Sequence, residues 1–152
     1  MHKNDGRCAH CQLIIKKYPG IDYNLKTWFE RLQVKYPEVH VSEAGRGKEQ
    51  QEILLRKKAT KARWTESSHN YNCALDLFEL GGESKSDIYE KNWFMTVIAP
   101  NVPSYLEWYG WPEYKNKKDK FYELPHIEVK NWKNLRDLGL VSLVEEIEIK
   151  SA

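Results

Sequence analysis

The segment TESSHNYNCALDL, residues Thr65–Leu77, combines a polar loop with the start of an apolar run. It contains His69 and, seven residues later, Asp76. The run at 74–78 predicts a strand with Asp76 on one face and leucines on the other. An offset of seven would put His69 on the opposite face of a regular strand. We therefore expect His69 in the preceding loop, folded back toward Asp76 through a tight bend at Asn72, since Asn tolerates a positive φ.

A second polar segment, ELPHIE at 123–128, supplies further groups for a metal site. Imidazole and carboxylate both bind zinc, and a catalytic zinc takes three such groups while a fourth position stays open. Pro125 favours an extended entry, after which the residues alternate as in a strand. His126 is then the third candidate ligand, and Glu123 can reach the open position from the entry loop.

Together the two segments match the pattern of a peptidase family. The matching residues are Ser67, His69, Asn72, Ala74, Asp76, Glu123 and His126. Their order resembles the zinc peptidases that cut peptidoglycan stem peptides, which include D-alanyl-D-alanine carboxypeptidases and dipeptidases and phage L-alanyl-D-glutamate endopeptidases. The family usually has Gly where Asn72 stands, and Asn is the next-best residue for such a bend. The resemblance extends from about Val41 to Glu128.

The resemblance implies a role for each of the main groups. His69, Asp76 and His126 are the expected zinc ligands. Glu123 is the expected base, which takes a proton from the attacking water and gives one to the leaving amine. The expected cofactor is zinc, and the expected substrate is a peptidoglycan stem peptide.

Three further residues are candidates for catalysis, substrate binding or support. Arg46 lies between two glycines and upstream of Gln51, as an arginine does before a Gln-containing helix in the family. We expect it to bind a substrate carboxylate or the oxyanion; the alternative is an exposed turn arginine. Ser67 is expected to orient the His69 loop through a hydrogen bond. Trp108 belongs to an aromatic segment that resembles the one before the family's final histidine, and it suits a cleft wall or the core.

Length and composition indicate one globular domain. The 152 residues are 41% hydrophobic and 12% aromatic, and they predict a single domain over 1–152 with residues 1–20 as an N-terminal extension. A net charge of +2 is too small to indicate nucleic acid. No apolar run approaches membrane-spanning length, and Met1–Gln12 lacks the apolar core of a signal peptide. We expect a monomer without nucleic-acid or membrane partners, made in the cytoplasm without a signal peptide and acting on the cell wall after release.

The cysteines Cys8, Cys11 and Cys73 are too few for a disulfide framework. Cys8 and Cys11 form a C-x-x-C pair without a second pair to complete a four-ligand site. A structural zinc that adds His2 or His10 is one interpretation, and two reduced thiols near a mobile end is the one we favour. We expect Cys73 to be a small buried packing residue. We assign no functional role to His40 or Glu128 from the sequence.

Periodicity and turn residues predict the order of the elements. Helices are expected over about 22–36, 48–58, 87–98 and 132–138, strands over 39–42, 74–78 and 126–129, and a final strand or docked end over 144–150. By resemblance, the fold is α+β: a small antiparallel sheet that carries the metal ligands, with flanking helices, as in the hedgehog signalling domain and D-alanyl-D-alanine peptidases.

The predicted function is that of a zinc metallopeptidase, a phage-type L-alanyl-D-glutamate endopeptidase or endolysin. The alternative within this class is a D-alanyl-D-alanine carboxypeptidase or dipeptidase. A different class is a non-catalytic zinc-binding cell-wall module, although such a module needs neither Glu123 nor Arg46. The third class, a nucleic-acid binder built on Cys8, Cys11 and the lysine runs, predicts strongly salt-dependent DNA binding.

Overall fold

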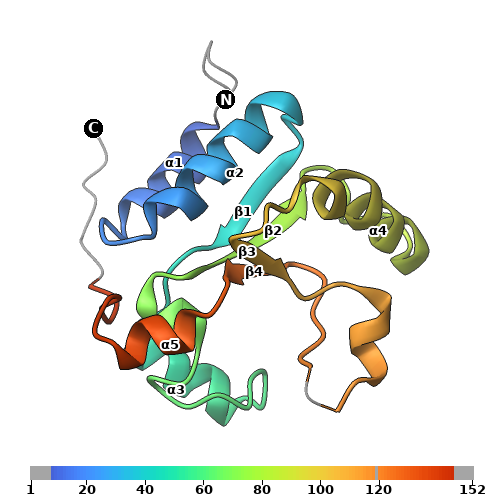
Figure 1. The fold of residues 1–152 in the computed structure, drawn as a ribbon. Helices are drawn as coiled ribbons and strands as arrows, with labels where there is room; N and C mark the ends of the chain where they lie inside the picture. The colour runs from blue at the N-terminus through green and yellow to red at the C-terminus, as the bar shows by residue number, and fades with distance from the viewer. Residues whose placement is uncertain (1–7, 119, 146–152) are drawn as a thin grey trace.

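A computed structural model describes residues 8–118 and 120–145 of the chain. In these ranges a four-stranded antiparallel sheet is flanked by helices, which confirms the predicted α+β class (Figure 1). The strands are β1 (Val39–Glu43), β2 (Ala74–Glu79), β3 (Leu106–Trp108) and β4 (His126–Val129). The helices are α1 (Ala9–Lys16), α2 (Tyr23–Lys35), α3 (Lys48–Arg56), α4 (Asp87–Trp93) and α5 (Trp132–Asp137). Short helical turns cover Ser68–Tyr71, Phe94–Ile98, Ala99–Asn101 and Pro112–Asn116.

The strand order β1-β2-β4-β3 brings together residues that are far apart in the sequence. Asp76 on β2 lies directly opposite His126 on β4. On the other side of β2, Glu43 of β1 pairs with Asp76, after a register shift between Val41 and Glu43. Three adjacent strands therefore present ionisable side chains at neighbouring positions.

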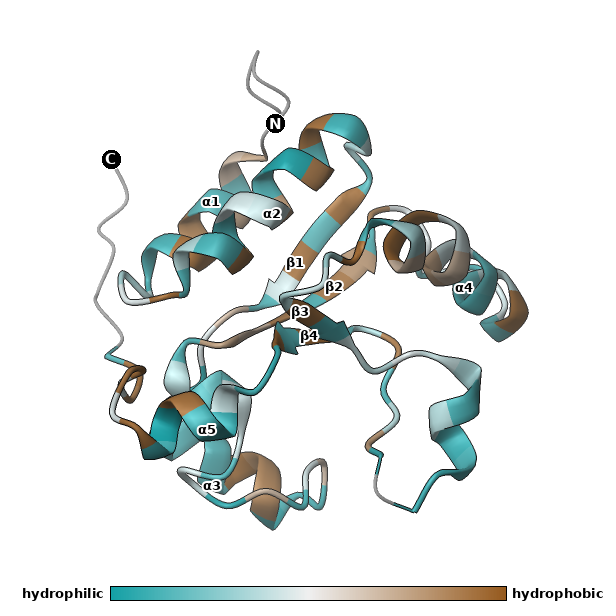
Figure 2. Cartoon of the chain, viewed as in Figure 1, coloured by the Kyte–Doolittle hydropathy of each residue, from teal (hydrophilic) through white to brown (hydrophobic). Residues whose placement is uncertain are grey.

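The core lies between the sheet and its helices. Helices α1 and α2 pack against β1 (Figure 1). Leu75 and Leu77 on β2 are fully buried, whereas Asp76 between them is partly exposed, so the predicted alternation of β2 is confirmed. In Figure 2, hydrophobic and hydrophilic residues alternate along β1, and the turn after α4 is mainly hydrophobic. Both kinds of residue also alternate along α1 and α2, as in helices with one buried face. No helix in the described ranges is long and apolar enough to cross a membrane.

The predicted helices and strands are present with ends that differ by a few residues. Helix α2, for example, begins after Asp22, whose carboxylate accepts a 2.9 Å hydrogen bond from the backbone N–H of Leu25. Helix α1 and strand β3 were not predicted as such. Helix α1 has only eight residues and no side-chain cap, so its start carries no sequence signal. Most of the final element predicted over 144–150 lies outside the described residues.

The cysteine predictions have different outcomes. Cys8, the N-cap of α1, is 4% exposed, and Cys11 within α1 is 0% exposed, so both belong to the core. Both thiols are free, as the preferred interpretation of two reduced thiols expects. Its placement of them near a mobile end is corrected, because both are buried in the core. Cys73 is fully buried, as predicted. Burial, together with the charges of Asp22 and Glu128, raises the pKa of Cys73 to about 12.

Candidate active site

The loop before β2 is held by the side chain of Asn70. This fully buried amide accepts 3.1 Å hydrogen bonds from the backbone N–H groups of Thr65 and Ser67. It donates to the carbonyl oxygen of Arg46 at 2.9 Å and to Oε1 of Gln51 at 3.1 Å. Sequence reasoning missed Asn70, although a serine followed three residues later by an amide is a sign of a reciprocal capping arrangement. The loop shape is thus fixed by one side chain.

His69 is turned back onto β2, as the sequence predicts. The backbone N–H of His69 donates a 3.2 Å hydrogen bond to Oγ of Ser67. Asn72 adopts the left-handed conformation, with φ 62° and ψ 27°, which confirms the predicted bend. As a result, Nε2 of His69 lies 3.2 Å from Oδ1 of Asp76, and Nδ1 lies 2.8 Å from the carbonyl oxygen of Ala44.

The three candidate ligands converge on one point. Nδ1 of His126 lies 3.3 Å from Oδ1 of Asp76, and the ligand atoms of His69, Asp76 and His126 all lie within 4.8 Å of one another. Zinc binds nitrogen and oxygen at about 2.0–2.2 Å, so tetrahedral ligands should be separated by about 3.3–3.6 Å. The two measured separations, 3.2 and 3.3 Å, fit this requirement closely.

The hydrogen bonds of the two rings also fit a metal. The carbonyl oxygen of Ala44 can only accept, so Nδ1 of His69 carries a proton. On the other ring, Nε2 of His126 donates at 2.7 Å to Oε1 of Glu128. When the two rings are neutral, each therefore has its lone pair directed toward Asp76, as a metal ligand requires.

Glu128 is a site residue that sequence reasoning missed. Besides its bond to His126, its Oε2 accepts a 2.8 Å hydrogen bond from the hydroxyl of Tyr109. Oγ of Ser68 lies 3.2 Å from Nε2 of His126. The available signal was the two-residue spacing on a strand, which puts Glu128 on the same face as His126.

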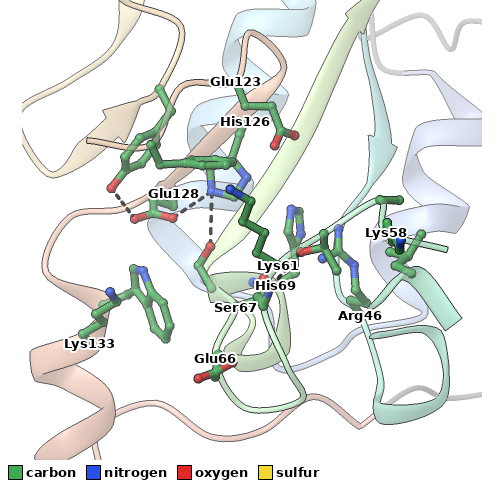
Figure 3. Close-up of a pocket in the computed structure, with 18 residues that line it drawn as sticks. Arg46, Lys58, Lys61, Glu66, Ser67, His69, Glu123, His126, Glu128 and Lys133 are labelled. Atoms are coloured by element: carbon green, nitrogen blue, oxygen red, sulfur yellow. Dashed lines mark hydrogen bonds and ion pairs between the residues drawn. The ribbon is translucent and has the colours of Figure 1, made fainter. Parts of the chain in front are cut away.

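These residues border a pocket of about 610 Å³ (Figure 3). Its lining includes His69, His126, Glu123, Arg46 and Glu128. The size falls in the range of sites for small molecules and short peptides. Lysines add positive charge to the rim: Lys58, Lys61 and Lys133.

Arg46 and Trp108 lie in different environments from each other. Arg46 lines the pocket with its side chain 11% exposed, so it is not the exposed turn arginine of the alternative interpretation. Its Nη1 donates to Oε1 of Gln51 at 3.1 Å, and its Nη2 pairs with Glu43.

Trp108 is 1% exposed in the core and does not line the pocket, so the cleft-wall interpretation is corrected. Its indole N–H donates at 2.6 Å to the carbonyl oxygen of Leu124, beside Glu123.

Comparison with known proteins gives a match in structure only. No family model matches the chain, and no curated protein sequence matches it. The L-Ala D-Glu endopeptidase ChiX of Serratia marcescens superposes with a TM-score of 0.58 and 16% sequence identity, over 86% of this chain and 90% of that chain. The two proteins share a fold.

On this shared fold, charge is concentrated at the candidate ligands. Burial raises the pKa of Asp76, but the charge of His69 and the hydrogen bonds from His126 and His69 outweigh burial and hold it well below its usual range. Burial lowers the pKa of His126, but its bonds to Asp76 and Glu128 raise it to about 9 in the metal-free protein. Glu128 has a lowered pKa, since its bond to His126 outweighs burial.

Glu123, the expected base, has a raised pKa. It is held by its backbone N–H, which donates at 2.9 Å to the carbonyl oxygen of Tyr109. Burial and then the negative charge of Asp76 raise the pKa of Glu123, and the nearby histidines and Arg46 offset part of this rise. A carboxylate with a raised pKa holds a proton more readily than an ordinary glutamate does, so it can both accept and donate one.

Proposed function

We propose that this protein is a zinc-dependent peptidase that cleaves peptidoglycan stem peptides, most specifically at the L-alanyl-D-glutamate bond. The observation that carries the proposal is the convergence of His69, Asp76 and His126 within 4.8 Å, at a pocket that also contains Glu123. The fold shared with an L-Ala D-Glu endopeptidase supports the choice of bond. In this role the protein is a phage-type endolysin, which acts on the wall after release.

Each residue has a defined task in this proposal. Zinc, when bound, supplies Lewis-acid chemistry and brings the pKa of a water molecule to about 7. Glu123 takes a proton from the attacking water and passes one to the leaving amine. Arg46 uses two of its five N–H donors on Glu43 and Gln51 and has others for the substrate carbonyl. Ala44 and Glu128 fix the orientation of the two histidine rings.

The rim of the pocket favours an anionic peptide. Lys58, Lys61 and Lys133 border the same space as Glu123. A stem peptide carries free carboxylates, and a cluster of positive charges attracts them and raises the local substrate concentration. The same positive charge attracts a neutral peptide less strongly.

The test is digestion of purified peptidoglycan by the zinc-loaded protein, with the fragments identified by mass spectrometry. Native protein should produce new L-alanine carboxyl termini. Glu123→Gln should bind zinc normally and cleave about 10²–10⁴-fold more slowly. Glu113→Gln, a change of an exposed glutamate outside the pocket, should cleave like the native protein.

Other outcomes lead to the other functions. Release of terminal D-alanine alone indicates a D-alanyl-D-alanine carboxypeptidase. Cleavage of free D-alanyl-D-alanine without attack on peptidoglycan indicates a dipeptidase. If native protein binds zinc and peptidoglycan but releases no fragment, the protein is a binding module and the proposal is wrong.

A further inference from the structure

A second group of side chains of the types that bind metals lies away from the pocket, between α1 and β1. It consists of Cys8, Cys11 and His40, whose ligand atoms all lie within 4.8 Å of one another. None of the three lines the pocket of the candidate active site. This group includes the C-x-x-C pair that the proposed peptidase does not use.

Local structure explains why the three side chains meet. Cys8 is the N-cap of α1 and Cys11 lies three residues later, so both project from the same side of the first turn. His40 comes from β1, against which α1 packs. Sγ of Cys11 lies 3.3 Å from Nδ1 of His40. With zinc–sulfur bonds of about 2.3 Å and zinc–nitrogen bonds of about 2.0–2.1 Å, tetrahedral ligands of these types lie about 3.6 Å apart.

The surroundings of Cys11 favour a thiolate once a metal is present. The backbone N–H of Val41 and Nε2 of Gln33 both lie 3.5 Å from Sγ of Cys11 and point donors at it. Gln33, which is fully buried, also accepts a 2.8 Å hydrogen bond from the backbone N–H of Cys8 and donates to the carbonyl oxygen of Val39 at 2.7 Å. Donors aimed at a sulfur stabilise its charged form and fix its position.

Burial argues against a redox role for the same cysteines. Reactive cysteines are partly exposed and have lowered pKa values. Cys8 and Cys11 are both buried, and neither forms a disulfide. Buried thiols are inert in redox chemistry, so their position beside a histidine is better explained by a structural metal site.

We propose that Cys8, Cys11 and His40 bind a structural zinc ion that fastens α1 to β1. Two thiolates and one imidazole are a ligand set that zinc prefers. A water molecule or a further side chain completes the tetrahedron. His10 is exposed and outside the group of close ligand atoms, so the interpretation that uses His10 is not the one proposed. His2 lies outside the described residues.

The position of this site connects it to the pocket through β1. The strand runs on from His40 to Glu43, and the carbonyl oxygen of the next residue, Ala44, holds the ring of His69. Tyr18, which follows α1, packs so closely on Gly45 that a Cβ there would lie 2.3 Å from the tyrosine ring. Fastening α1 to β1 thus stabilises the segment behind His69. The proposed zinc is structural and does not depend on the peptidase activity.

The absorption spectrum of bound cobalt(II) distinguishes the two sites, because only the site with thiolate ligands produces an intense sulfur-to-cobalt charge-transfer band. The experiment titrates metal-free, reduced protein with cobalt and records the absorption spectrum, and zinc content is measured in parallel. Native protein should show the band and bind two zinc ions per chain. His69→Asn should keep the band and bind one zinc. Cys11→Ser should lose the band and bind one zinc.

Two further variants complete the design. Cys73→Ser is the matched control, because Cys73 is equally buried but lies outside the cluster, and it should keep the band. His40→Asn should weaken cobalt binding at the thiolate site by more than about 100-fold, beyond the roughly 10–100-fold loss that removal of a residue supporting a ligand causes. If Cys11→Ser does not fold, the native spectrum and His40→Asn still decide the question.

Three results would overturn the second site. The first is native protein that binds cobalt without a charge-transfer band. The second is His40→Asn with unchanged cobalt affinity. The third is a Cys8–Cys11 disulfide in protein purified without reductant under metal-replete conditions, seen as a loss of two hydrogens in its mass. A peptidase without this band retains the proposed function and loses only the structural zinc.

Discussion

Oε1 of Glu128 lies 2.7 Å from Nε2 of His126, two residues away on the same strand. The bond turns the other ring nitrogen of His126 toward Asp76. Because the hydroxyl of Tyr109 holds the second oxygen of Glu128, the carboxylate has little freedom to turn away. A ligand ring is thus oriented by a buried carboxylate that is itself held in place.

Replacement of Glu128 should weaken zinc binding at the candidate active site. Glu128→Ala removes the carboxylate, which both orients the ring of His126 and raises the basicity of that ring. We therefore expect a 10–100-fold loss of zinc affinity, measured by competition with a chelator. The control is Glu107→Ala, because Glu107 lies directly opposite Glu128 in the sheet but pairs with Lys120. Equal affinities of the two variants would show that Glu128 does not support the ligand.

Replacement of Asn70 should destabilise the whole loop. Asn70→Ala removes a buried amide with four hydrogen bonds, and we expect the free energy of unfolding to fall by about 3 kcal/mol, since each buried group left unsatisfied costs about 1–3 kcal/mol. Urea unfolding measures the change. Asn134→Ala, at an exposed position on α5, should stay within about 0.5 kcal/mol of the native protein. A similarly small loss for Asn70→Ala would contradict the structural role.

The bend at Asn72 allows a test of backbone strain. Asn72→Ala and Asn72→Gly lose nearly the same side-chain contacts, but only Gly accepts a φ of 62° without steric cost. We therefore expect Asn72→Gly to be more stable than Asn72→Ala by about 1 kcal/mol in thermal or urea unfolding. The opposite order would mean that the loop relaxes out of the left-handed conformation.

The role of Arg46 depends on the shape of its guanidinium. Arg46→Lys keeps the positive charge but loses the planar fork that joins Glu43 and Gln51. We expect kcat to fall about 10²–10³-fold with a small change in KM, as for loss of an oxyanion donor. Arg56→Lys, an exposed change on α3, is the control. A pure KM effect would assign Arg46 to ground-state binding of a carboxylate.

The stability of metal-free protein should depend on pH through His126. Its pKa is about 9 in the folded state, above the ordinary value of 6.5. The protonated ring therefore stabilises the folded state fully below pH 6.5, and this contribution is lost as the pH rises through 9. Unfolding free energies measured in chelator from pH 6 to 9.5 should decrease over this interval. His126→Gln should lack this part of the slope, and an identical slope in both proteins would contradict the assignment.

Local signals in the sequence were sufficient for much of the site. The alternation around Asp76 predicted which side of β2 faces the core, and the tolerance of Asn for positive φ predicted the bend. Pro125 and the alternation after it predicted β4. These features depend on a few neighbouring residues, so they can be recognised without knowledge of distant contacts.

Other features depended on partners far away in the chain. Trp108 has the same aromatic character whether it lines a cleft or fills the core. Only its packing against Phe94 and Trp111 shows that it belongs to the core. Glu128 had a visible spacing to His126, but its bond to Tyr109 spans 19 residues.

By itself, the sequence determined the α+β order of elements, the loop that returns His69 to Asp76, and the candidate ligands, because periodicity, turn residues and spacing are local properties. Only the tertiary structure decided the pairing of β2 with β4, which sets Asp76 opposite His126. It also decided the burial of α1, which brings Cys8 and Cys11 to His40, 29 residues beyond Cys11. Such contacts arise from burial of apolar surface over the whole domain, and no short segment contains that information.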